Sequence, residues 1–185
     1  PPFHAASLRR EYKADLHIFD IMVHIDKHSN SFVQRKLKIK YFKKRGAIML
    51  IKSKKVWSSG QFLPLIVEVE DKKITAVYDY DAFDKVDYDF GANRILPGFI
   101  DVHTHGAYGY DTNDVNEEGL RNWTKNIVSE GVTSFLPTTI TQTEEVLLKA
   151  VANVAKVYEE GYEGAEILGI HFEGPYLDVE KRGAQ

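Results

Sequence analysis

The stretch ILPGFIDVHTHG, residues 95–106, decides the fold because it joins an apolar run to two histidines one residue apart. A short apolar run bounded by glycine is typical of a strand buried in a parallel sheet. Side chains at positions i and i+2 of a strand point to the same side, so His103 and His105 are predicted to face the same way and could grip one cation. On these residues alone, two polar residues closing a buried strand remain an alternative.

Strand and helix patterns alternate after this stretch. Residues 133–139 (TSFLPTT) and 165–175 (AEILGIHFEGP) are predicted to form two further buried strands. The helix between the first two strands is predicted to begin at the cap Asn116 and to end at Gly131. Its apolar positions, at helical spacing, are Leu120, Trp123, Ile127 and Val128.

A second helix is predicted between the second and third strands. It opens with a capping box of Thr141 and Glu144, and Gly161 is its expected end. Its apolar stripe, which we expect to face the core, comprises Val146, Leu147, Ala150, Val151, Val154 and Tyr158.

The order strand, helix, strand, helix, strand predicts an α/β fold with parallel strands and right-handed crossovers. The C-terminal strand ends carry the site in α/β barrels and in open sheets alike. Glu173 ends the third strand and is therefore predicted to converge with His103 and His105. Imidazole nitrogens and a carboxylate suit zinc, and also iron or manganese. His171 and Asp101 share faces with these residues, and we expect them to support the ligands or to be structural.

The segment 49–94 reads as short strands of a small β-domain. Its clearest feature is PLIVEVEDKKITAVYDY, residues 64–80, in which two alternating runs flank a polar turn. This pattern predicts a hairpin, with Val67 and Val69 on one face and Ile74 and Ala76 able to pair with them. A hairpin alone is marginally stable, so further strands are expected.

Residues 1–48 fit neither pattern. They hold 11 lysine and arginine residues against four acidic ones, whereas the remainder holds 13 against 23. Such a split can indicate a basic nucleic-acid-binding arm joined to an acidic domain. The alternative hypothesis is that Met49 is the natural start, since KKRG shortly before it is what a purine-rich ribosome-binding site would encode. Residues 1–48 would then be translated upstream DNA or an added sequence.

The composition excludes several kinds of site. The chain has no cysteine, so disulfides and cysteine-ligated zinc are excluded. No uninterrupted apolar run is long enough to span a bilayer, and no basic-then-apolar secretion signal opens the chain. With 43% hydrophobic and 28% charged residues the chain is globular in composition, and we expect a cytoplasmic protein without a membrane partner.

Three motifs carry a resemblance to a known family. PGFIDVHTHG (residues 97–106) resembles the first-strand signature of the amidohydrolase superfamily. GVTSFLPTT (131–139) and ILGIHFEGPYLDVEKRGAQ (167–185) narrow the similarity to the family of N-acetylglucosamine-6-phosphate deacetylases. The similarity covers about residues 49–185 and the N-terminal part of that family's chain.

This resemblance implies a metal-dependent (β/α)8 barrel. Residues 95–185 would supply its first three strands, and residues 49–94 would be part of a small β-sandwich domain. It implies hydrolysis of N-acetylglucosamine 6-phosphate to glucosamine 6-phosphate and acetate, by an enzyme that is a homodimer at full length. We therefore expect this chain to be an N-terminal fragment, inactive and poorly soluble when isolated.

The resemblance also implies roles for individual residues. Glu173 matches the family's metal-binding glutamate, and His103 and His105 match a histidine pair of those members that can hold a second metal, so one or two ions are expected. Ala184 and Gln185 match a segment that contacts the sugar. The family's catalytic aspartate and two further metal-binding histidines come later in the barrel, beyond Gln185, so no catalytic residue is assigned within this chain.

Two alternatives rank below this one. The first is another amidohydrolase acting on a cyclic amide or N-acyl substrate. A metal-bridging lysine at the end of the fourth strand would favour it, and Glu173 argues against it. The second is a non-catalytic fragment with a basic nucleic-acid-binding arm, and we do not expect nucleic acid to be the partner.

Overall fold

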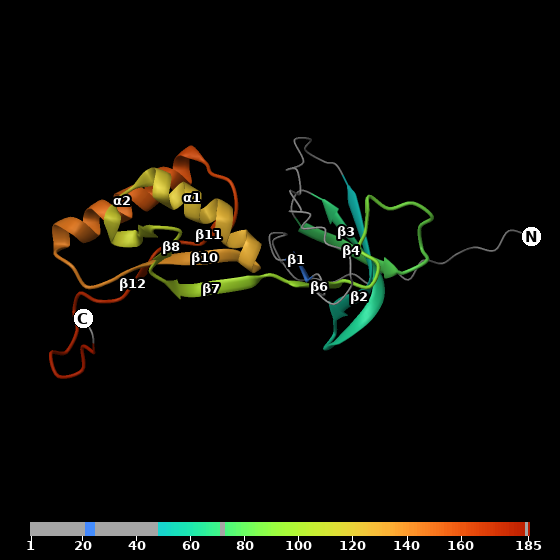
Figure 1. The fold of residues 1–185 in the computed structure, drawn as a ribbon, viewed down its shortest axis with the longest axis horizontal. Coiled ribbons are helices and arrows are strands. Elements are labelled where there is room, and N and C mark those ends of the chain that lie inside the picture. Colours follow the sequence, from blue (N-terminus) through green and yellow to red (C-terminus); the bar gives the residue numbers. More distant parts are fainter. Residues whose placement is uncertain (1–20, 25–47, 71–72, 184) are drawn as a thin grey trace, which may run out of the picture. The chain divides into compact units, whose positions relative to one another are not determined.

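The computed structural model describes residues 21–24, 48–70, 73–183 and 185 (Figure 1). Predictions about most of residues 1–48, about the middle of the 64–80 turn and about Ala184 fall outside these residues. The chain divides into two compact units, Pro1–Pro97 and Gly98–Gln185. No helix among the described residues is long and apolar enough to cross a membrane.

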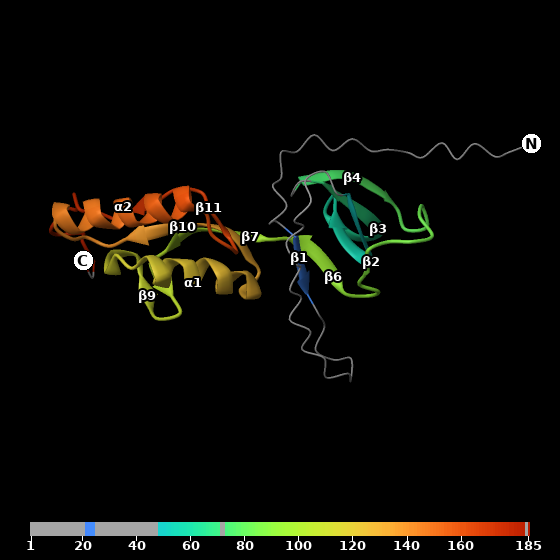
Figure 2. The same cartoon turned by 90° about the horizontal axis from the view of Figure 1, so that it is seen from above.

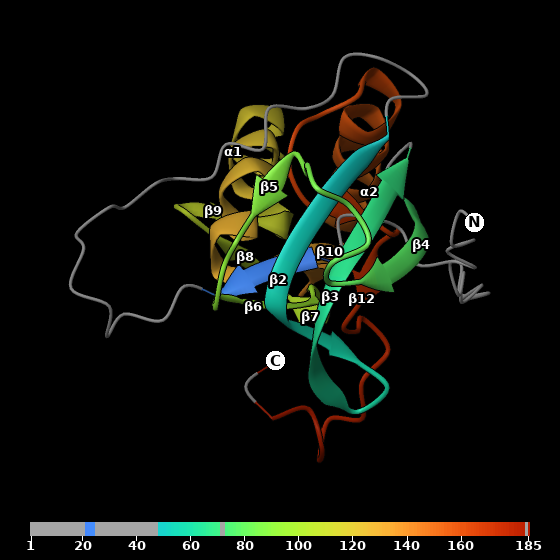
Figure 3. The ribbon, with the colours of Figure 1, turned by 90° about the vertical axis from the view of Figure 1, so that its right-hand side faces the viewer.

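The described residues of the first unit form a six-stranded sheet with the strand order β1-β6-β2-β3-β4, in which β5 also pairs with β2. The neighbours β2, β3 and β4 are antiparallel (Figure 3). Both β5 and β6 pair in parallel with β2, one after the other along its free edge, and β1 pairs antiparallel with β6. The strands are β1 Ile21–His24, β2 Met49–Ser58, β3 Gln61–Glu70, β4 Lys73–Asp79, β5 Tyr88–Asp89 and β6 Arg94–Pro97.

The turn residues between the strands and the alternation of buried and exposed side chains along them explain how this sheet forms. Ser59 and Gly60, between β2 and β3, both have positive φ, 50° and 82°, and such turns match the twist of a tight hairpin. The predicted hairpin of β3 and β4 is confirmed, with Val69 opposite Ile74. Ala76 lies opposite Glu68 rather than a valine, because the register shifts by one residue at this point. One cluster of buried core residues comprises Met49, Ile51, Val56, Val67, Val69 and Ile95, and Ile66 and Ala76 are buried as well.

The second unit is α/β, as predicted, with two helices on one face of a parallel sheet (Figures 1 and 2). Strand β10 is central, and β7, β11 and β12 all pair with it in parallel. The main elements are β7 Phe99–Thr104, α1 Glu117–Ile127, β10 Val132–Thr139, α2 Glu144–Glu160, β11 Glu166–Ile167 and β12 His171–Phe172. After β7 come a small hairpin and a 3-10 turn, β8 Gly106–Ala107, β9 Tyr110–Asp111 and η2 Thr112–Asp114; a second turn, η3 Val128–Glu130, follows α1.

The strands differ from the prediction in two ways: two of them are interrupted, and the first is exposed rather than buried. The 95–106 stretch is divided into two strands at Gly98. A Cβ atom at this position would lie 2.2 Å from the Thr133 side chain. The residues before Gly98 belong to β6, in the first unit. The third strand is divided into β11 and β12. The prediction that the first strand is buried was wrong. Its apolar residues Phe99, Ile100 and Val102 are 54–58% exposed, because β7 is an edge strand that pairs with β10 alone among the described strands.

The first helix follows the prediction closely. The Asn116 side chain accepts a hydrogen bond from the backbone N–H of Gly119, and the helix continues through η3 to Gly131, whose φ is 88°. Trp123 is fully buried against Tyr110 and Phe135, with Leu120 and Ile127 beside it. Val128 differs from its predicted place among the apolar positions of the helix. It lies in η3, where the change of helical pitch leaves its side chain 40% exposed.

The second helix differs at both its start and its stripe. Its cap is Thr143, whose hydroxyl accepts a hydrogen bond from Val146 N–H, so the predicted capping box of Thr141 and Glu144 is wrong. The helix ends at Gly161, as predicted. Tyr158, predicted as core, is 58% exposed, because the buried stripe turns through Val157 instead. The other buried stripe residues include Leu147, Ala150, Asn153 and Val154.

Candidate metal centre

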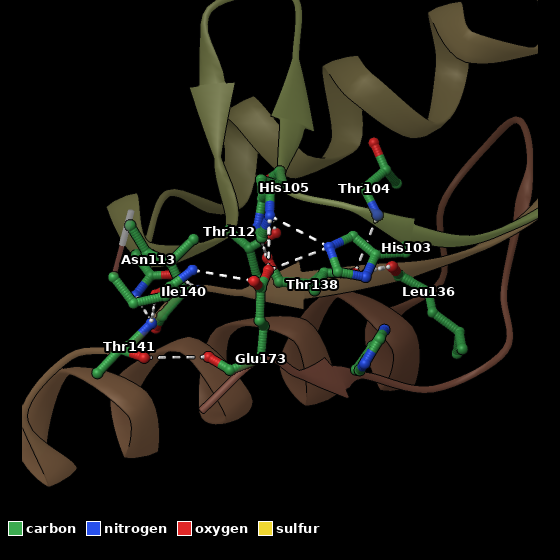
Figure 4. A network of polar contacts seen from close by, with 12 residues as sticks. His103, Thr104, His105, Thr112, Asn113, Leu136, Thr138, Ile140, Thr141 and Glu173 are labelled. Carbon is green, nitrogen blue, oxygen red and sulfur yellow. Dashed lines mark hydrogen bonds and ion pairs between the residues drawn. The ribbon is translucent and has the colours of Figure 1, made fainter. Parts of the chain in front are cut away.

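Three potential ligands meet at the C-terminal ends of the strands of the second unit. His103 lies in β7, His105 follows it directly, and Glu173 follows β12. The strand register explains the meeting, because Thr104 of β7 is opposite Pro137 and Phe172 of β12 is opposite Thr139, so both strands end beside the end of β10. Figure 4 shows the two imidazoles and the Glu173 carboxylate pointing toward one another.

The distances among these side chains form a compact triangle. His103 Nε2 and His105 Nε2 are each 3.1 Å from Glu173 Oε2, and the two Nε2 atoms are 3.3 Å apart. Around a tetrahedral ion with bonds of about 2.0–2.1 Å, neighbouring ligand atoms are separated by about 3.3–3.4 Å. The separations in the triangle are therefore close to those that one divalent cation requires of three of its ligands.

The orientation of His105 is set by the neighbouring strand. Its Nδ1 lies 3.1 Å from the carbonyl oxygen of Thr138, which can only accept a hydrogen bond, so Nδ1 carries the proton. In the neutral imidazole Nε2 then presents a lone pair toward Glu173. The backbone carbonyl of His105 in turn accepts hydrogen bonds from the N–H and the hydroxyl of Thr112, both at 2.8 Å.

The triangle concentrates lone pairs in a small volume. With both imidazoles neutral, Glu173 Oε2 and His105 Nε2 are both acceptors, and His103 Nε2 can supply at most one proton between them. A positive charge among these atoms, which lie within 3.1–3.3 Å of one another, is therefore stabilising, and a proton on an imidazole or a bound cation can supply it. The side chains are 46%, 35% and 33% exposed, for His103, His105 and Glu173 respectively, so an ion from solvent can reach them.

The two neighbours that we expected to be supporting residues do contact the site, without joining the triangle. Asp101 Oδ1 accepts a hydrogen bond from the backbone N–H of His103, at 3.1 Å, rather than from its ring. His171 Nδ1 lies 2.9 Å from the Val102 carbonyl oxygen, and its ring packs edge-on to that of His103 with 4.8 Å between centroids. Both contacts hold the end of β7 in place.

The support of Glu173 comes from β10 and from Gln185. The backbone N–H of Glu173 donates to the Thr139 carbonyl at 3.2 Å, and Gln185 Nε2 donates to Glu173 Oε1 at 3.0 Å. Sequence reasoning anticipated only sugar contact for Gln185, and no spacing rule could have paired it with a residue twelve positions earlier. It also missed Asn113, whose side chain bonds both backbone groups of Ile140.

Comparison with known proteins gives the same family as the motifs. The amidohydrolase family matches residues 94–183. The N-acetylglucosamine-6-phosphate deacetylase of Vibrio furnissii is 37% identical over 116 residues, which are 62% of this chain and 29% of that protein. The protein of that name from Bacillus subtilis (strain 168) is 44% identical over 94 residues, 49% of this chain and 24% of its own length. This chain thus spans less than a third of the length of either relative.

Solved structures extend the similarity to the fold. The N-acetylglucosamine-6-phosphate deacetylase from Pasteurella multocida superposes with a TM-score of 0.67 at 30% identity, covering 75% of this chain and 37% of that one. A mutant of the Mycobacterium smegmatis deacetylase in complex with N-acetyl-D-glucosamine-6-phosphate gives a TM-score of 0.63 at 27% identity, covering 72% and 34%. The resemblance predicted from the motifs is therefore confirmed: over the region compared, this chain is similar to the N-acetylglucosamine-6-phosphate deacetylases of the amidohydrolase family.

Proposed function

We propose that this chain is part of an enzyme that hydrolyses the 2-acetamido group of N-acetylglucosamine 6-phosphate, giving glucosamine 6-phosphate and acetate. The observation that carries the proposal is the triangle of His103, His105 and Glu173 at the strand ends, in a chain whose relatives are named for this deacetylation. The substrate would be an amino-sugar phosphate, acted on in the cytoplasm by a homodimer.

The donor set of the triangle fits one or two divalent cations of the zinc, iron or manganese kind. When bound, such a cation polarises the amide carbonyl and lowers the pKa of the attacking water. The chain's own part is to present ligand atoms in place: Thr138 turns the His105 ring so that Nε2 is free, and the strand end places His103 beside it. Glu173 contributes Oε2 to the same point.

We further propose that the second unit is the beginning of a (β/α)8 barrel. Its parallel strands, its helices on one face and the unpaired edge of β7 with its exposed apolar residues support this reading, as does the share of the relatives that the chain spans. The boundaries expected at residue 95 move to residue 98, because β6 pairs within the first unit: we propose residues 98–185 for the first three barrel strands, residues 49–97 for part of a β-sandwich domain and residues 1–48 for an unmatched segment. The catalytic aspartate and remaining metal-binding histidines would belong to later strands, and Ala184 and Gln185 to the sugar-contacting segment.

A chimaera tests the reaction. Residues 49–185 would be joined to the remaining part of the Bacillus subtilis relative, loaded with zinc, iron or manganese, and assayed for acetate release from N-acetylglucosamine 6-phosphate. We expect turnover in the chimaera, a loss of at least about 100-fold in its Glu173→Ala variant, and none from the 185-residue chain alone. The exposed Gln142→Ala variant should match the parent chimaera.

Two results would contradict the proposal. A folded, metal-loaded chimaera that hydrolyses a cyclic amide or another N-acyl compound, but not the amino-sugar phosphate, would overturn the substrate assignment. Release of acetate by the isolated 185-residue chain would overturn its assignment as a catalytically incomplete part of the enzyme.

A further inference from the structure

We infer that Gln185 is a positioning residue for Glu173: its side-chain amide holds one carboxylate oxygen, so that the other is directed at the two imidazoles. The inference rests on the proposed function, because it takes the triangle of His103, His105 and Glu173 to be a cation site. It goes beyond the sugar contact that the resemblance implies for this residue.

The two oxygens of Glu173 have different partners. Oε2 lies 3.1 Å from His103 Nε2 and 3.1 Å from His105 Nε2, whereas Oε1 accepts a hydrogen bond from Gln185 Nε2 at 3.0 Å. A carboxylate rotating freely about its last bond would turn both oxygens out of line with the imidazoles. The hydrogen bond from Gln185 to Oε1 holds the plane of the carboxylate, and it leaves the lone pairs of the other oxygen, Oε2, for the imidazole side.

Gln185 is itself held in position. Its Oε1 accepts a hydrogen bond from the backbone N–H of Thr141 at 2.9 Å, so its Nε2 must face Glu173. Thr141 Oγ1 also lies 3.5 Å from the backbone carbonyl oxygen of Glu173. The amide therefore bridges the segment after β10 and the Glu173 carboxylate, with its donor and acceptor ends fixed by different partners.

The bridge continues into the support of the histidine side. Ile140, the neighbour of Thr141, has its N–H bonded to Asn113 Oδ1 at 3.1 Å and its carbonyl to Asn113 Nδ2 at 3.3 Å. Asn113 adjoins Thr112, which donates two hydrogen bonds to the His105 carbonyl. Figure 4 shows this run of polar contacts from the carboxylate side to the imidazole side. One polar scaffold thus positions ligands from two different strands.

The expected effect is on cation affinity. A carboxylate that is already oriented loses less conformational freedom when it binds an ion, and partners beyond the direct ligands are typically worth about 10–100-fold in metal affinity. Removing the amide while keeping the length of the side chain isolates this contribution. Methionine is unbranched and of similar length, and it has no N–H to donate.

The test measures Zn²⁺ and Co²⁺ binding to the whole 185-residue chain. The Zn²⁺ dissociation constant would be determined by competition with a chromophoric chelator, and the Co²⁺ form by its visible absorption, which reports ligand geometry. We expect Gln185→Met to weaken Zn²⁺ binding about 10–100-fold and to shift the Co²⁺ bands. Gln142→Met, an exposed glutamine near the same segment, should change neither, and circular dichroism should show all variants folded.

The outcomes separate this inference from the proposed function. Wild-type chain that binds Zn²⁺, with Gln185→Met binding it equally and giving the same Co²⁺ spectrum, would overturn the positioning role and leave the proposed function standing. If the wild-type chain binds neither ion, the triangle does not hold a cation by itself and the positioning role inferred for Gln185 in this chain is overturned, whereas the proposed function is still tested by the metal-loaded chimaera. If Gln185→Met is unfolded, Gln185→Ala takes its place with the same expected loss, and unfolding of both would show a structural role instead.

Discussion

Two adjacent threonines at the end of β10 should respond in opposite ways to the same substitution. Thr138 and Thr139 are both fully buried, and valine has nearly the shape of threonine without the hydroxyl. The Thr138 hydroxyl makes two hydrogen bonds, whereas the Thr139 hydroxyl has no partner among the described residues. Thr138→Val should therefore destabilise the second unit, and Thr139→Val should not.

The magnitudes follow from what each hydroxyl does. Where the pairing of β7 with β10 shifts register, the Thr138 hydroxyl accepts the Thr104 N–H at 3.0 Å and donates to the Leu136 carbonyl at 3.0 Å. Valine leaves that N–H without its acceptor, which costs about 1–3 kcal/mol. Burying the unpaired Thr139 hydroxyl costs about 1–3 kcal/mol already, so its removal should be neutral or stabilise by up to about 2 kcal/mol. The two variants should differ by about 1–5 kcal/mol.

Tryptophan fluorescence during urea unfolding can measure this difference in the second unit alone. The chain has two tryptophans, and replacing the partly exposed Trp57 by phenylalanine leaves the fully buried Trp123 as the reporter. With an m value of about 2 kcal/mol/M, Thr138→Val should lower the urea midpoint by about 1 M. Thr139→Val should leave the midpoint unchanged or raise it. If both variants fall by the same amount, the reasoning from hydroxyl partners is refuted.

Three further predictions concern other parts of the second unit. Burial raises the pKa of Tyr110 from 10.0 to about 12, so the folded chain keeps a proton that the unfolded chain loses. The free energy of unfolding should therefore be full below pH 10 and should fall by roughly 2–3 kcal/mol up to pH 12. Urea titrations should find this decline reduced in Tyr110→Phe. Gly164→Ala should cost about 2–4 kcal/mol, because its φ is 108° and the new Cβ would lie 1.9 Å from the Thr124 carbonyl oxygen. Gly161→Ala, whose Cβ would meet no neighbour but whose φ of 83° and ψ of 152° are almost restricted to glycine, should cost less, about 1–3 kcal/mol, in thermal melts of the two variants. Zn²⁺ at about 100 times its dissociation constant should stabilise the unit by about 2.7 kcal/mol, and a calorimetric shift that persists in His103→Ala would contradict binding at the triangle.

The sequence was sufficient for the order of elements and for the convergence of the triangle. Both rest on strong local signals, since Asn116 and Gly131 are helix boundary residues and the i, i+2 rule aligns His103 with His105. Position at the end of a strand was enough to bring Glu173 to the same edge. These features depend on periods of two and 3.6 residues, which can be read from one chain.

What the sequence could not provide depends on contacts between segments. Thr141 resembles a helix cap, but its backbone N–H is bonded to Gln185, and the helix begins at Thr143 instead. The apolar run of β7 reads as buried, although Val102 is 58% exposed because β7 lies at the edge of the sheet and pairs with β10 alone among the described strands. In both cases the local pattern is the same for either outcome, and only the neighbouring segment decides.

Strand β10 shows why ligand types alone do not explain the site. It supplies no member of the triangle, yet its last residues position all of it. The Thr138 carbonyl orients the His105 ring, and the Thr138 hydroxyl fixes the backbone between the two histidines. The Thr139 carbonyl accepts the N–H of Glu173. Both ligand-bearing strands therefore depend on the same short segment, and a small displacement at the end of β10 would move a histidine and the carboxylate together.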